Sequence, residues 1–221
     1  MNEPLHIPDH WTFEVDNVAE HFDDHVREQL PWYDLITNAV AIVARQYIPE
    51  NGKVYDIGAS TGNIGRALAR TLEIKNAEFT AIESSKEMAD QYNGPGELKV
   101  IDARKFDFRA YDCAICFLVL MFLSPHEREW FLRELISKMK KGGALIVVDK
   151  TKPTSGYPSV ALSRLTIAGK VAAGAAASEI IEKELSLSGY QRPLDESELP
   201  DHSVEFFRFG EFAGWIIESL K

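Results

Sequence analysis

The strongest constraint on the fold comes from residues 54–63, where an apolar stretch runs directly into a glycine-rich turn. The segment reads Val-Tyr-Asp-Ile-Gly-Ala-Ser-Thr-Gly-Asn, and a helix-forming sequence continues to Leu72. Gly58 and Gly62 allow a tight turn and let the backbone come close to a ligand. The helix that follows begins with free N–H groups, which favour an anionic group. A strand, a tight turn and a helix in this order predict a nucleotide-binding corner.

Apolar runs and helical patterns alternate along the rest of the chain, which predicts a mostly parallel sheet with helices on both faces. Residues 112–122 are almost entirely apolar, as expected of a strand that is buried on both faces. Residues 159–190 are expected to form a helical insertion before a final hairpin. The pattern predicts helices over 16–29, 32–48, 63–72, 85–92 and 126–140, and strands over 53–57, 78–82, 97–101, 111–118 and 143–149.

Three carboxylates lie where a nucleoside cofactor would need acceptors. Glu83 ends the apolar run that starts at Phe79, a position from which a carboxylate can accept hydrogen bonds from a ribose diol. Asp56 lies two residues before Gly58, as in the acidic-x-Gly-x-Gly-x-Gly turn of class I methyltransferases, and can reach the methionine end of the cofactor. Asp102 follows a strand-like run and suits the exocyclic amine of adenine. Together with residues 140–149, which are similar to the turn into strand five, these pieces resemble the class I S-adenosylmethionine-dependent methyltransferases.

A short-chain dehydrogenase with a nicotinamide cofactor is the main competing interpretation of the glycine turn. Residues 58–65, Gly-Ala-Ser-Thr-Gly-Asn-Ile-Gly, look like the TGxxxGxG turn of those enzymes. They also need a Tyr-x-x-x-Lys pair, in which the lysine lowers the pKa of the tyrosine. No tyrosine of this sequence is followed by a lysine at that offset. The dehydrogenase interpretation is therefore the weaker one.

Within the first 33 residues, the sequence resembles one particular family of these proteins. Val18-Ala-Glu-His-Phe-Asp-Asp-His-Val26 and Leu30-Pro-Trp-Tyr33 look like the N-terminal helix and loop of the carboxy-S-adenosylmethionine synthases, enzymes of tRNA wobble-uridine modification. Ser60 replaces the middle glycine of the turn, as it does in that family, and residues 122–125 and 207–210 match as well. The resemblance implies a Rossmann-like class I methyltransferase fold with a seven-stranded sheet. It also implies one domain over 1–221, with a helical cap at 1–50 and the insertion at 159–190.

The resemblance further implies a site for S-adenosyl-L-methionine. Tyr33 would border the methionine portion of the cofactor. The catalytic residue stays open, with Tyr33 and His126 as candidates, because His126 follows Pro125 near the end of a strand, where acceptors bind in open α/β sheets. The expected cofactor-binding residues are Tyr33, Asp56, Gly58, Ala59, Ser60, Gly62, Glu83, Ser84, Asp102, Ala103 and Phe117.

Two departures from that family bear on the reaction. Phe117 stands where the family has an asparagine near the sulfonium, and Glu184 falls at or near the arginine that holds the carboxy group. A carboxylate there would repel that group, unless Lys183 or Arg192 takes the role of the arginine. The sequence thus favours a methyltransferase that uses plain S-adenosylmethionine on a small-molecule acceptor. The alternatives are a carboxy-S-adenosylmethionine synthase proper, and a catalytically silent cofactor-binding or scaffold protein, which Phe117 favours.

Composition limits the classes of partner that the chain is expected to bind. The net charge of −10 over 221 residues disfavours nucleic acid, since phosphate contacts need clustered Lys and Arg. The longest apolar run, residues 114–123, is too short to cross a membrane, and the first residues lack the pattern of an export signal, so a cytoplasmic enzyme is expected. Cys113 and Cys116 should be buried on opposite faces of one strand, and neither histidine pair has partners at metal-ligand spacing. A homodimer is also expected.

An aromatic set near the N-terminus offers a wall for the acceptor. Its members are Trp11, Phe13, Phe22, Trp32 and Tyr33. Packing of the N-terminal helix against the sheet would use the same residue types equally well. The sequence leaves these two roles open.

Overall fold

A computed structural model describes residues 7–14 and 16–220 of the chain. Helices and strands alternate through most of it, as the sequence predicts. The helices are α1 (Asp16–Gln29), α2 (Tyr33–Tyr47), α3 (Asn63–Ile74), α4 (Lys86–Asp90), α5 (Pro125–Lys138), α6 (Tyr157–Ala172) and α7 (Ala177–Ser186), with 3-10 turns η1 (Ala103–Lys105), η2 (Leu120–Phe122) and η3 (Glu196–Glu198). The strands are β1 (Lys53–Ile57), β2 (Glu78–Glu83), β3 (Glu97–Val100), β4 (Tyr111–Phe117), β5 (Met139–Lys150), β6 (Val204–Phe209) and β7 (Phe212–Glu218).

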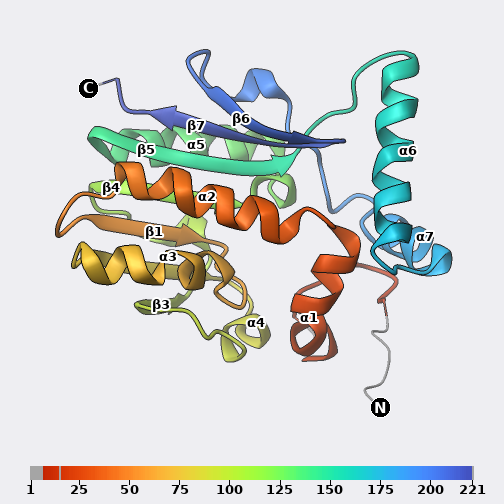
Figure 1. Cartoon of the computed structure of the whole chain (residues 1–221), viewed down its shortest axis with the longest axis horizontal. Helices are drawn as coiled ribbons and strands as arrows, with labels where there is room; N and C mark the ends of the chain where they lie inside the picture. The colour runs from red at the N-terminus through yellow and green to blue at the C-terminus, as the bar shows by residue number, and fades with distance from the viewer. Residues whose placement is uncertain (1–6, 15, 221) are drawn as a thin grey trace.

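The strands form one seven-stranded sheet with the order β3-β2-β1-β4-β5-β7-β6 (Figure 1). The first five strands are parallel, while β7 runs antiparallel to both β5 and β6. This is the predicted Rossmann-like sheet with its final hairpin. Most predicted bounds differ from the observed ones by at most two residues. The largest difference is at β5, which begins at Met139 rather than at residue 143, because Met139 pairs with Tyr111 before a register shift in β4. Helix α5 accordingly ends at Lys138.

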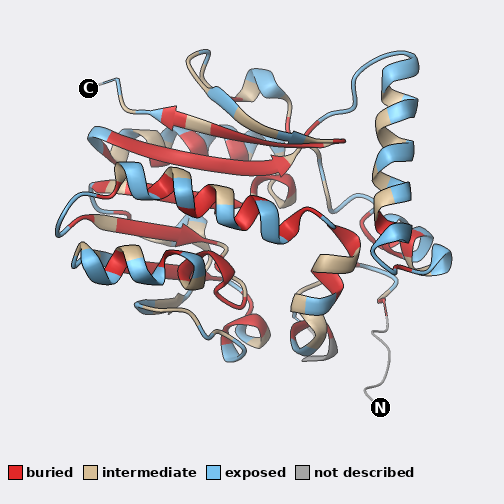
Figure 2. Ribbon diagram, in the orientation of Figure 1, coloured by how far each residue is buried: buried red, intermediate tan, exposed pale blue. Residues whose placement is uncertain are grey.

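Two hydrophobic cores lie on opposite faces of the sheet. Helices α2 and α3 pack on one face, and α5 packs on the other (Figure 1). The central strands are therefore buried on both sides, as Figure 2 shows for β1 and β5. Cys113 belongs to the first core and Cys116 to the second, so the predicted opposite orientation is confirmed, and neither forms a disulfide among the described residues.

Local sequence signals explain where two helices start. Gly62 precedes α3 with φ of +94°, a left-handed conformation that glycine adopts without strain. Ser124 caps α5 through a reciprocal pair of hydrogen bonds with Glu127, and Pro125 occupies the first helical position. Helix α3 follows the carboxyl end of β1, and α5 follows that of β4 after the 3-10 turn η2, so both helices begin beside the same edge of the sheet.

The insertion between β5 and the final hairpin folds into α6 and α7, which lie beyond the carboxyl ends of the parallel strands, next to α1 (Figure 1). Its two ends meet at one isolated β-bridge between Thr151 and Leu194. The N–H of Leu194 donates to the carbonyl of Lys150 (2.7 Å), and the N–H of Lys152 donates to that of Leu194 (2.8 Å). None of the described helices is both long and apolar enough to cross a membrane.

Candidate functional site

A cavity of about 550 Å³ opens at the carboxyl ends of β1, β2, β4 and β5. The predicted site residues that line it are Tyr33, Gly58, Ser60, Glu83, Ser84, Asp102, Ala103 and Phe117. Asp56, Ala59 and Gly62 belong to the same turn but are not among the lining residues. His126, the second catalytic candidate, is exposed at the start of α5 and does not line the cavity either.

The glycine turn, residues 58–62, leaves no room for side chains at its two glycines. Gly58 has φ of +71°, and a Cβ there would lie 2.5 Å from Cγ2 of Val119. A Cβ on Gly62 would lie 2.7 Å from the backbone nitrogen of Gly94. Ser60 also has a positive φ, 51°, which non-glycine residues seldom adopt outside constrained sites. The turn is thus held in a shape that brings backbone, rather than side chains, to the cavity.

Glu83 fixes this turn to the end of β2. One carboxylate oxygen accepts a hydrogen bond from the N–H of Ser60 (2.8 Å), and the other accepts from the N–H groups of Ser84 (2.7 Å) and Ser85 (2.9 Å). A carboxylate has about four acceptor positions. The sequence anticipated a ribose-binding carboxylate, but it gave no sign that the same group also holds the loop together.

Asp56 is fully enclosed below the turn. Neither of its carboxylate oxygens has a hydrogen-bond partner among the described residues, and its side chain is 1% exposed. Burial, with a smaller contribution from Glu83, raises the pKa of Asp56 to about 7. An unpaired buried carboxyl group is well suited to a cationic partner, which would restore the charged form.

Asp102 caps η1 and is already paired. Its carboxylate accepts from the backbone N–H of Arg104 (2.9 Å) and forms an ion pair with the guanidinium (2.7 Å). The hydrogen bond from the Arg104 side chain lowers the pKa of Asp102. Arg104 also pairs with Glu127 (2.5 Å). Asp102 therefore stays a carboxylate that can accept hydrogen bonds, as its predicted role beside the adenine amine requires.

Tyr33 and Phe117 meet on the cavity wall. Their rings pack edge to face with centroids 5.5 Å apart, and both side chains are buried. Burial raises the pKa of the Tyr33 hydroxyl well above its usual range, so the phenol keeps its proton at neutral pH. Tyr33 is therefore a neutral phenol on the cavity wall at neutral pH and not a base.

The aromatic set divides between the two roles that the sequence left open. Trp11, Phe13, Phe22 and Tyr33 line the cavity. Trp32 does not; it packs against three phenylalanines of the final hairpin, Phe207, Phe209 and Phe212. Trp32 therefore packs against the hairpin at the start of α2, whereas Tyr33, the first residue of that helix, lines the cavity.

The far end of the cavity, here called the cap compartment, is built by α1, α6 and α7. It contains His25, Gln29, Lys170, Lys183 and Glu184. The sequence interpretation did not single out His25, Gln29 or Lys170 as site residues. Their spacing gave one signal, since His25 and Gln29 lie four residues apart and share a face of α1. The signal for Lys170 is weaker, because a lysine in the last turn of a helix is most often a surface residue.

Glu184, expected to repel an anion, is paired in the structure. Its carboxylate lies 3.0 Å from Nζ of Lys170 and 3.8 Å from Nζ of Lys150. Lys183 also lines the cavity, whereas Arg192 does not and donates its backbone N–H to Met121 (2.7 Å). Of the two proposed substitutes for the family's arginine, the structure brings only Lys183 to the site.

Comparison with known proteins agrees with this geometry. Residues 54–143 match a family model described as a methyltransferase domain. A carboxy-S-adenosyl-L-methionine synthase of Staphylococcus epidermidis is 29% identical over 192 residues, which cover 85% of this chain and 84% of that protein. This relative bears the name of the family that residues 18–33 of the chain resemble.

Two solved structures share the fold. The plantazolicin methyltransferase BpumL in complex with SAH is similar with a TM-score of 0.60 and 14% identity, covering 91% of this chain and 89% of that one. Magnesium protoporphyrin IX methyltransferase of Synechocystis PCC 6803 with bound SAH has a TM-score of 0.56 and 16% identity, with 90% and 96% covered. The chain thus has the fold of the class I S-adenosylmethionine-dependent methyltransferases, and its residues 54–143 are similar to a methyltransferase domain.

Proposed function

We propose that the chain transfers a methyl group from S-adenosylmethionine to a small-molecule acceptor bound in the cap compartment. The observation that carries the proposal is the single cavity that joins the glycine turn to the cap compartment. A cavity of about 550 Å³ lies in the range of roughly 300–1,000 Å³ that is usual for small-molecule and cofactor sites. One end presents backbone and carboxylates, and the other presents aromatic and polar side chains of the insertion.

The residues around the turn fit a cationic nucleoside cofactor. Close backbone approach at Gly58 and an unpaired buried carboxyl at Asp56 suit a sulfonium compound that also carries an ammonium group. Tyr33, Ser60, Glu83, Ser84, Asp102, Ala103 and Phe117 would line the bound cofactor, with Ala59 and Gly62 shaping the turn. When bound, the cofactor supplies an activated methyl group, so the chain needs mainly to position the acceptor and exclude water.

Proton transfer is a minor part of this proposal. Tyr33 keeps its proton, and His126 lies outside the cavity lining. Neither catalytic candidate from the sequence is therefore placed to act as a base toward an acceptor in the cap compartment. The proposal assigns the rate enhancement to proximity, and Tyr33 to holding the methionine end of the cofactor.

A carboxy-S-adenosylmethionine synthase is the second candidate function. Lys183 lines the cavity while Glu184 is paired with Lys170, which removes the repulsion expected from the sequence. The shared name of the curated relatives supports this candidate as well. It differs from the first in one measurable respect, a preference for the carboxylated cofactor.

Calorimetric titration separates the candidates. S-Adenosylmethionine, its carboxy derivative and NADH are titrated in turn, after mass spectrometry has checked the protein for co-purified cofactor. Tighter binding of the plain cofactor supports methyl transfer and leads to an acceptor screen, and tighter binding of the carboxy form supports the synthase. Preference for NADH would contradict both. Binding of a cofactor without turnover of any acceptor would favour the silent scaffold.

We also propose a homodimer. Helix α6 exposes several large apolar side chains, and Figure 2 shows the helix as largely exposed along its length. These residues are Tyr157, Val160, Leu165, Ile167 and Val171. A second copy that brings the same face is a self-complementary partner. Light scattering on the eluting protein should give twice the chain mass, and Leu165→Glu should reduce it to one chain.

A further inference from the structure

The loop that follows β4 forms one wall of the cavity. Residues 118–122 of this loop are here called the wall segment, and four of them line the cavity: Leu118, Val119, Met121 and Phe122. Leu118 has φ of +62°, a left-handed conformation that bulky residues rarely adopt. Such a conformation persists only where the surrounding structure holds it. The groups that bind the wall segment therefore decide the shape of this wall.

The carboxylate of Asp149 binds the wall segment from the end of β5. Asp149 is 0% exposed, and one of its oxygens accepts a hydrogen bond from the N–H of Leu120 (2.7 Å). The backbone nitrogen of Met121 lies 3.3 Å from both oxygens, and the N–H of Lys150 donates to the second one (2.8 Å). Hydrogen bonds to an ionised acceptor are stronger than those between neutral groups. The wall segment is thus tied to β5 through a buried charge.

The wall segment contacts three other parts of the site. Cγ2 of Val119 lies 2.5 Å from the position that a Cβ on Gly58 would take, so the segment packs directly on the glycine turn. The ring of Phe122 packs edge to face on Phe13, with centroids 5.4 Å apart, and lies 5.2 Å from the ring of Tyr190. These contacts reach the stretch before α1 and the end of the insertion. A shift of the wall segment therefore changes both ends of the cavity.

The charge of Asp149 depends on its buried surroundings. Burial raises the pKa of Asp149 to about 7, while the backbone hydrogen bonds and the guanidinium of Arg128 act in the opposite direction. Arg128 is a buried residue of α5 that donates to the carbonyl of Arg192 (2.9 Å). From β4, the thiol of Cys116 interacts with the carboxylate, and burial keeps that thiol protonated by raising its pKa. The residue opposite Asp149 on β7 is the apolar Ala213.

We propose that Asp149 is a positioning residue of the site, which acts through the backbone of Leu120 and Met121 and sets how tightly the wall segment closes on a bound cofactor. The ionised carboxylate offers only acceptors to these N–H groups, whereas the protonated form has a donor in place of one acceptor. The wall segment is therefore held more tightly above about pH 7 than below it. This inference rests on the proposed function in taking S-adenosylmethionine as the ligand beside the segment.

Asp149→Asn tests the role of the carboxylate, because asparagine keeps the size and turns one acceptor oxygen into a donor. Calorimetric titration at pH 8 should show that S-adenosylhomocysteine binds at least about tenfold more weakly to this variant than to the native protein. Tyr111→Phe is the matched control, since it removes a buried hydrogen bond to the carbonyl of Leu135 (2.9 Å) at the other end of β4. Its melting temperature should fall while its affinity stays native. Equal affinities in the two variants would overturn the proposal.

The pH profile of the native protein gives a second measurement, which does not depend on a variant that folds. The probe is 5′-methylthioadenosine, which has the nucleoside but lacks the ammonium group that Asp56 suits. Its affinity should rise at least about threefold between pH 6 and pH 8, as Asp149 loses its proton. The rise should persist in Asp56→Asn, although the pKa of Asp56 is also about 7, and should vanish in Asp149→Asn. A flat native profile, or a rise that only Asp56→Asn abolishes, would overturn the proposal.

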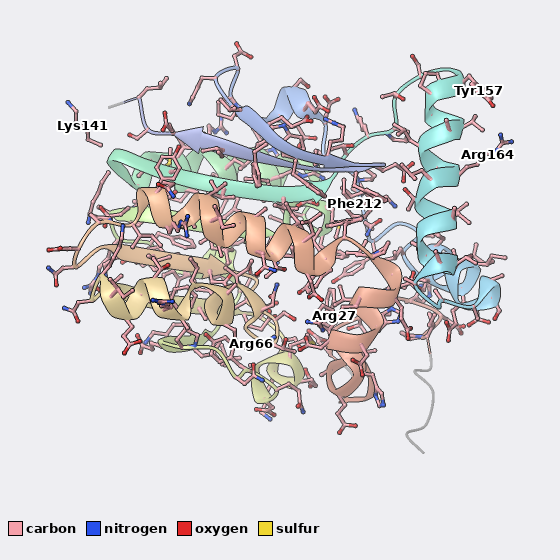
Figure 3. The ribbon with its side chains drawn as sticks, viewed as in Figure 1. Arg27, Arg66, Lys141, Tyr157, Arg164 and Phe212 are labelled. Atoms are coloured by element: carbon pink, nitrogen blue, oxygen red, sulfur yellow. The ribbon has the colours of Figure 1, made fainter. Side chains whose placement is uncertain are left out.

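The amide of Met121 reports the hydrogen bond to Asp149 without a ligand. The chain has four methionines, so ¹⁵N-methionine labelling gives few signals, and Met121→Leu identifies the one that belongs to Met121. This signal should titrate with a midpoint near 7 in the native protein and stay constant in Asp149→Asn. Lys141→Met changes an exposed residue at the other end of β5 (Figure 3) and should leave the midpoint where it is. A native signal that does not titrate would contradict the proposal.

Failure of the proposed function has a different result from failure of this inference. A native protein that binds neither S-adenosylhomocysteine nor 5′-methylthioadenosine would contradict the proposed function and the role of Asp149 together. Native binding of both, with unchanged affinity in Asp149→Asn and a flat pH profile, would leave the function intact and refute the role of Asp149 alone.

Discussion

The glycine turn and the cap compartment are two ends of one cavity, and they differ in how the backbone is held. At the turn, the carboxylate of Glu83 accepts three backbone N–H bonds, while both oxygens of the buried Asp56 carboxyl lack a partner in the described chain. In the cap compartment, Nε2 of His25 and the carboxamide of Gln29 are buried without hydrogen-bond partners in the described chain, and Lys183 is buried there without an ion pair. The turn is therefore fixed by hydrogen bonds to its backbone, whereas the cap compartment keeps buried side-chain groups that no described residue satisfies.

Gly58→Val should have the largest effect, because it attacks the shape of the turn. The new Cβ would meet Val119 at 2.5 Å from a backbone with φ of +71°. Backbone strain and overpacking of about 1–3 kcal/mol each should weaken cofactor binding about 100-fold or more. Gly142→Val is the control, since Gly142 also has positive φ (+73°) but nothing lies within 4 Å of its Cβ. If calorimetry shows that both variants lose the same cofactor affinity, the effect comes from backbone strain alone.

Glu83→Ala should lower both the free energy of unfolding and the cofactor affinity, because the Glu83 carboxylate holds three backbone N–H groups of the turn. Three backbone N–H groups lose their acceptor, so the free energy of unfolding should fall by about 2–4 kcal/mol. Denaturant titration measures this loss, and calorimetry measures the accompanying loss of cofactor affinity. Glu97→Ala, at the exposed start of β3, should change neither. Unchanged stability in Glu83→Ala would mean that the turn holds its shape without this carboxylate.

Lys183→Met should have the opposite sign on stability. The ammonium is buried without an ion pair in the described chain, and its pKa is lowered by burial and by Lys170. An apolar side chain of similar length should raise the free energy of unfolding by about 1 kcal/mol in the absence of ligand. Denaturant titration near pH 7 tests this, with Lys141→Met as the neutral reference. Destabilisation of the protein would show that the contact of Lys183 with Trp11 outweighs the cost of burial.

Asp56→Asn should change how the free energy of unfolding depends on pH. The difference between the variant and the native protein should be smallest at acidic pH. The folded-state pKa of Asp56 is raised to about 7, so folding favours the protonated carboxyl. Its contribution to stability is therefore fully present below the unfolded pKa near 4 and is lost as pH rises through about 7. The stability of the asparagine variant relative to the native protein should thus increase between pH 4 and 7 and then level off. A flat difference, measured by denaturant titration at several pH values, would place the proton elsewhere.

The sequence predicted the region that is fixed by local backbone geometry. The turn, the strands around it and the carboxylate at position 83 follow from glycine spacing and apolar periodicity. The helix at 16–29 and the strand at 53–57 have the predicted bounds. Even the difference at β5 has a local cause, because the register shift between Tyr111 and Cys113 lets Met139 pair four residues earlier than expected.

The cap compartment could not be predicted in the same way, since its character depends on which groups fail to find partners. A lysine at 183 beside a glutamate at 184 looks like a solvated helix face in sequence. Only the packing of α7 against Trp11 buries Lys183 and directs Glu184 to Lys170. Long-range packing of this kind has no periodic signal, so the sequence left open whether Lys183 or Arg192 would supply the positive charge, and only the structure brings Lys183 to the cavity.

The bridge between Thr151 and Leu194 has a consequence for how such a protein can diversify. Because the chain leaves the sheet and returns to it at one pair of residues, residues 153–191 form a closed excursion whose length hardly affects the strands. The entropy of closing such a loop grows only slowly with its length. Recombination could therefore exchange this segment as a unit, giving new acceptor preferences to an unchanged nucleotide-binding half. The sheet can therefore accept different insertions at this one place without a change in its strands.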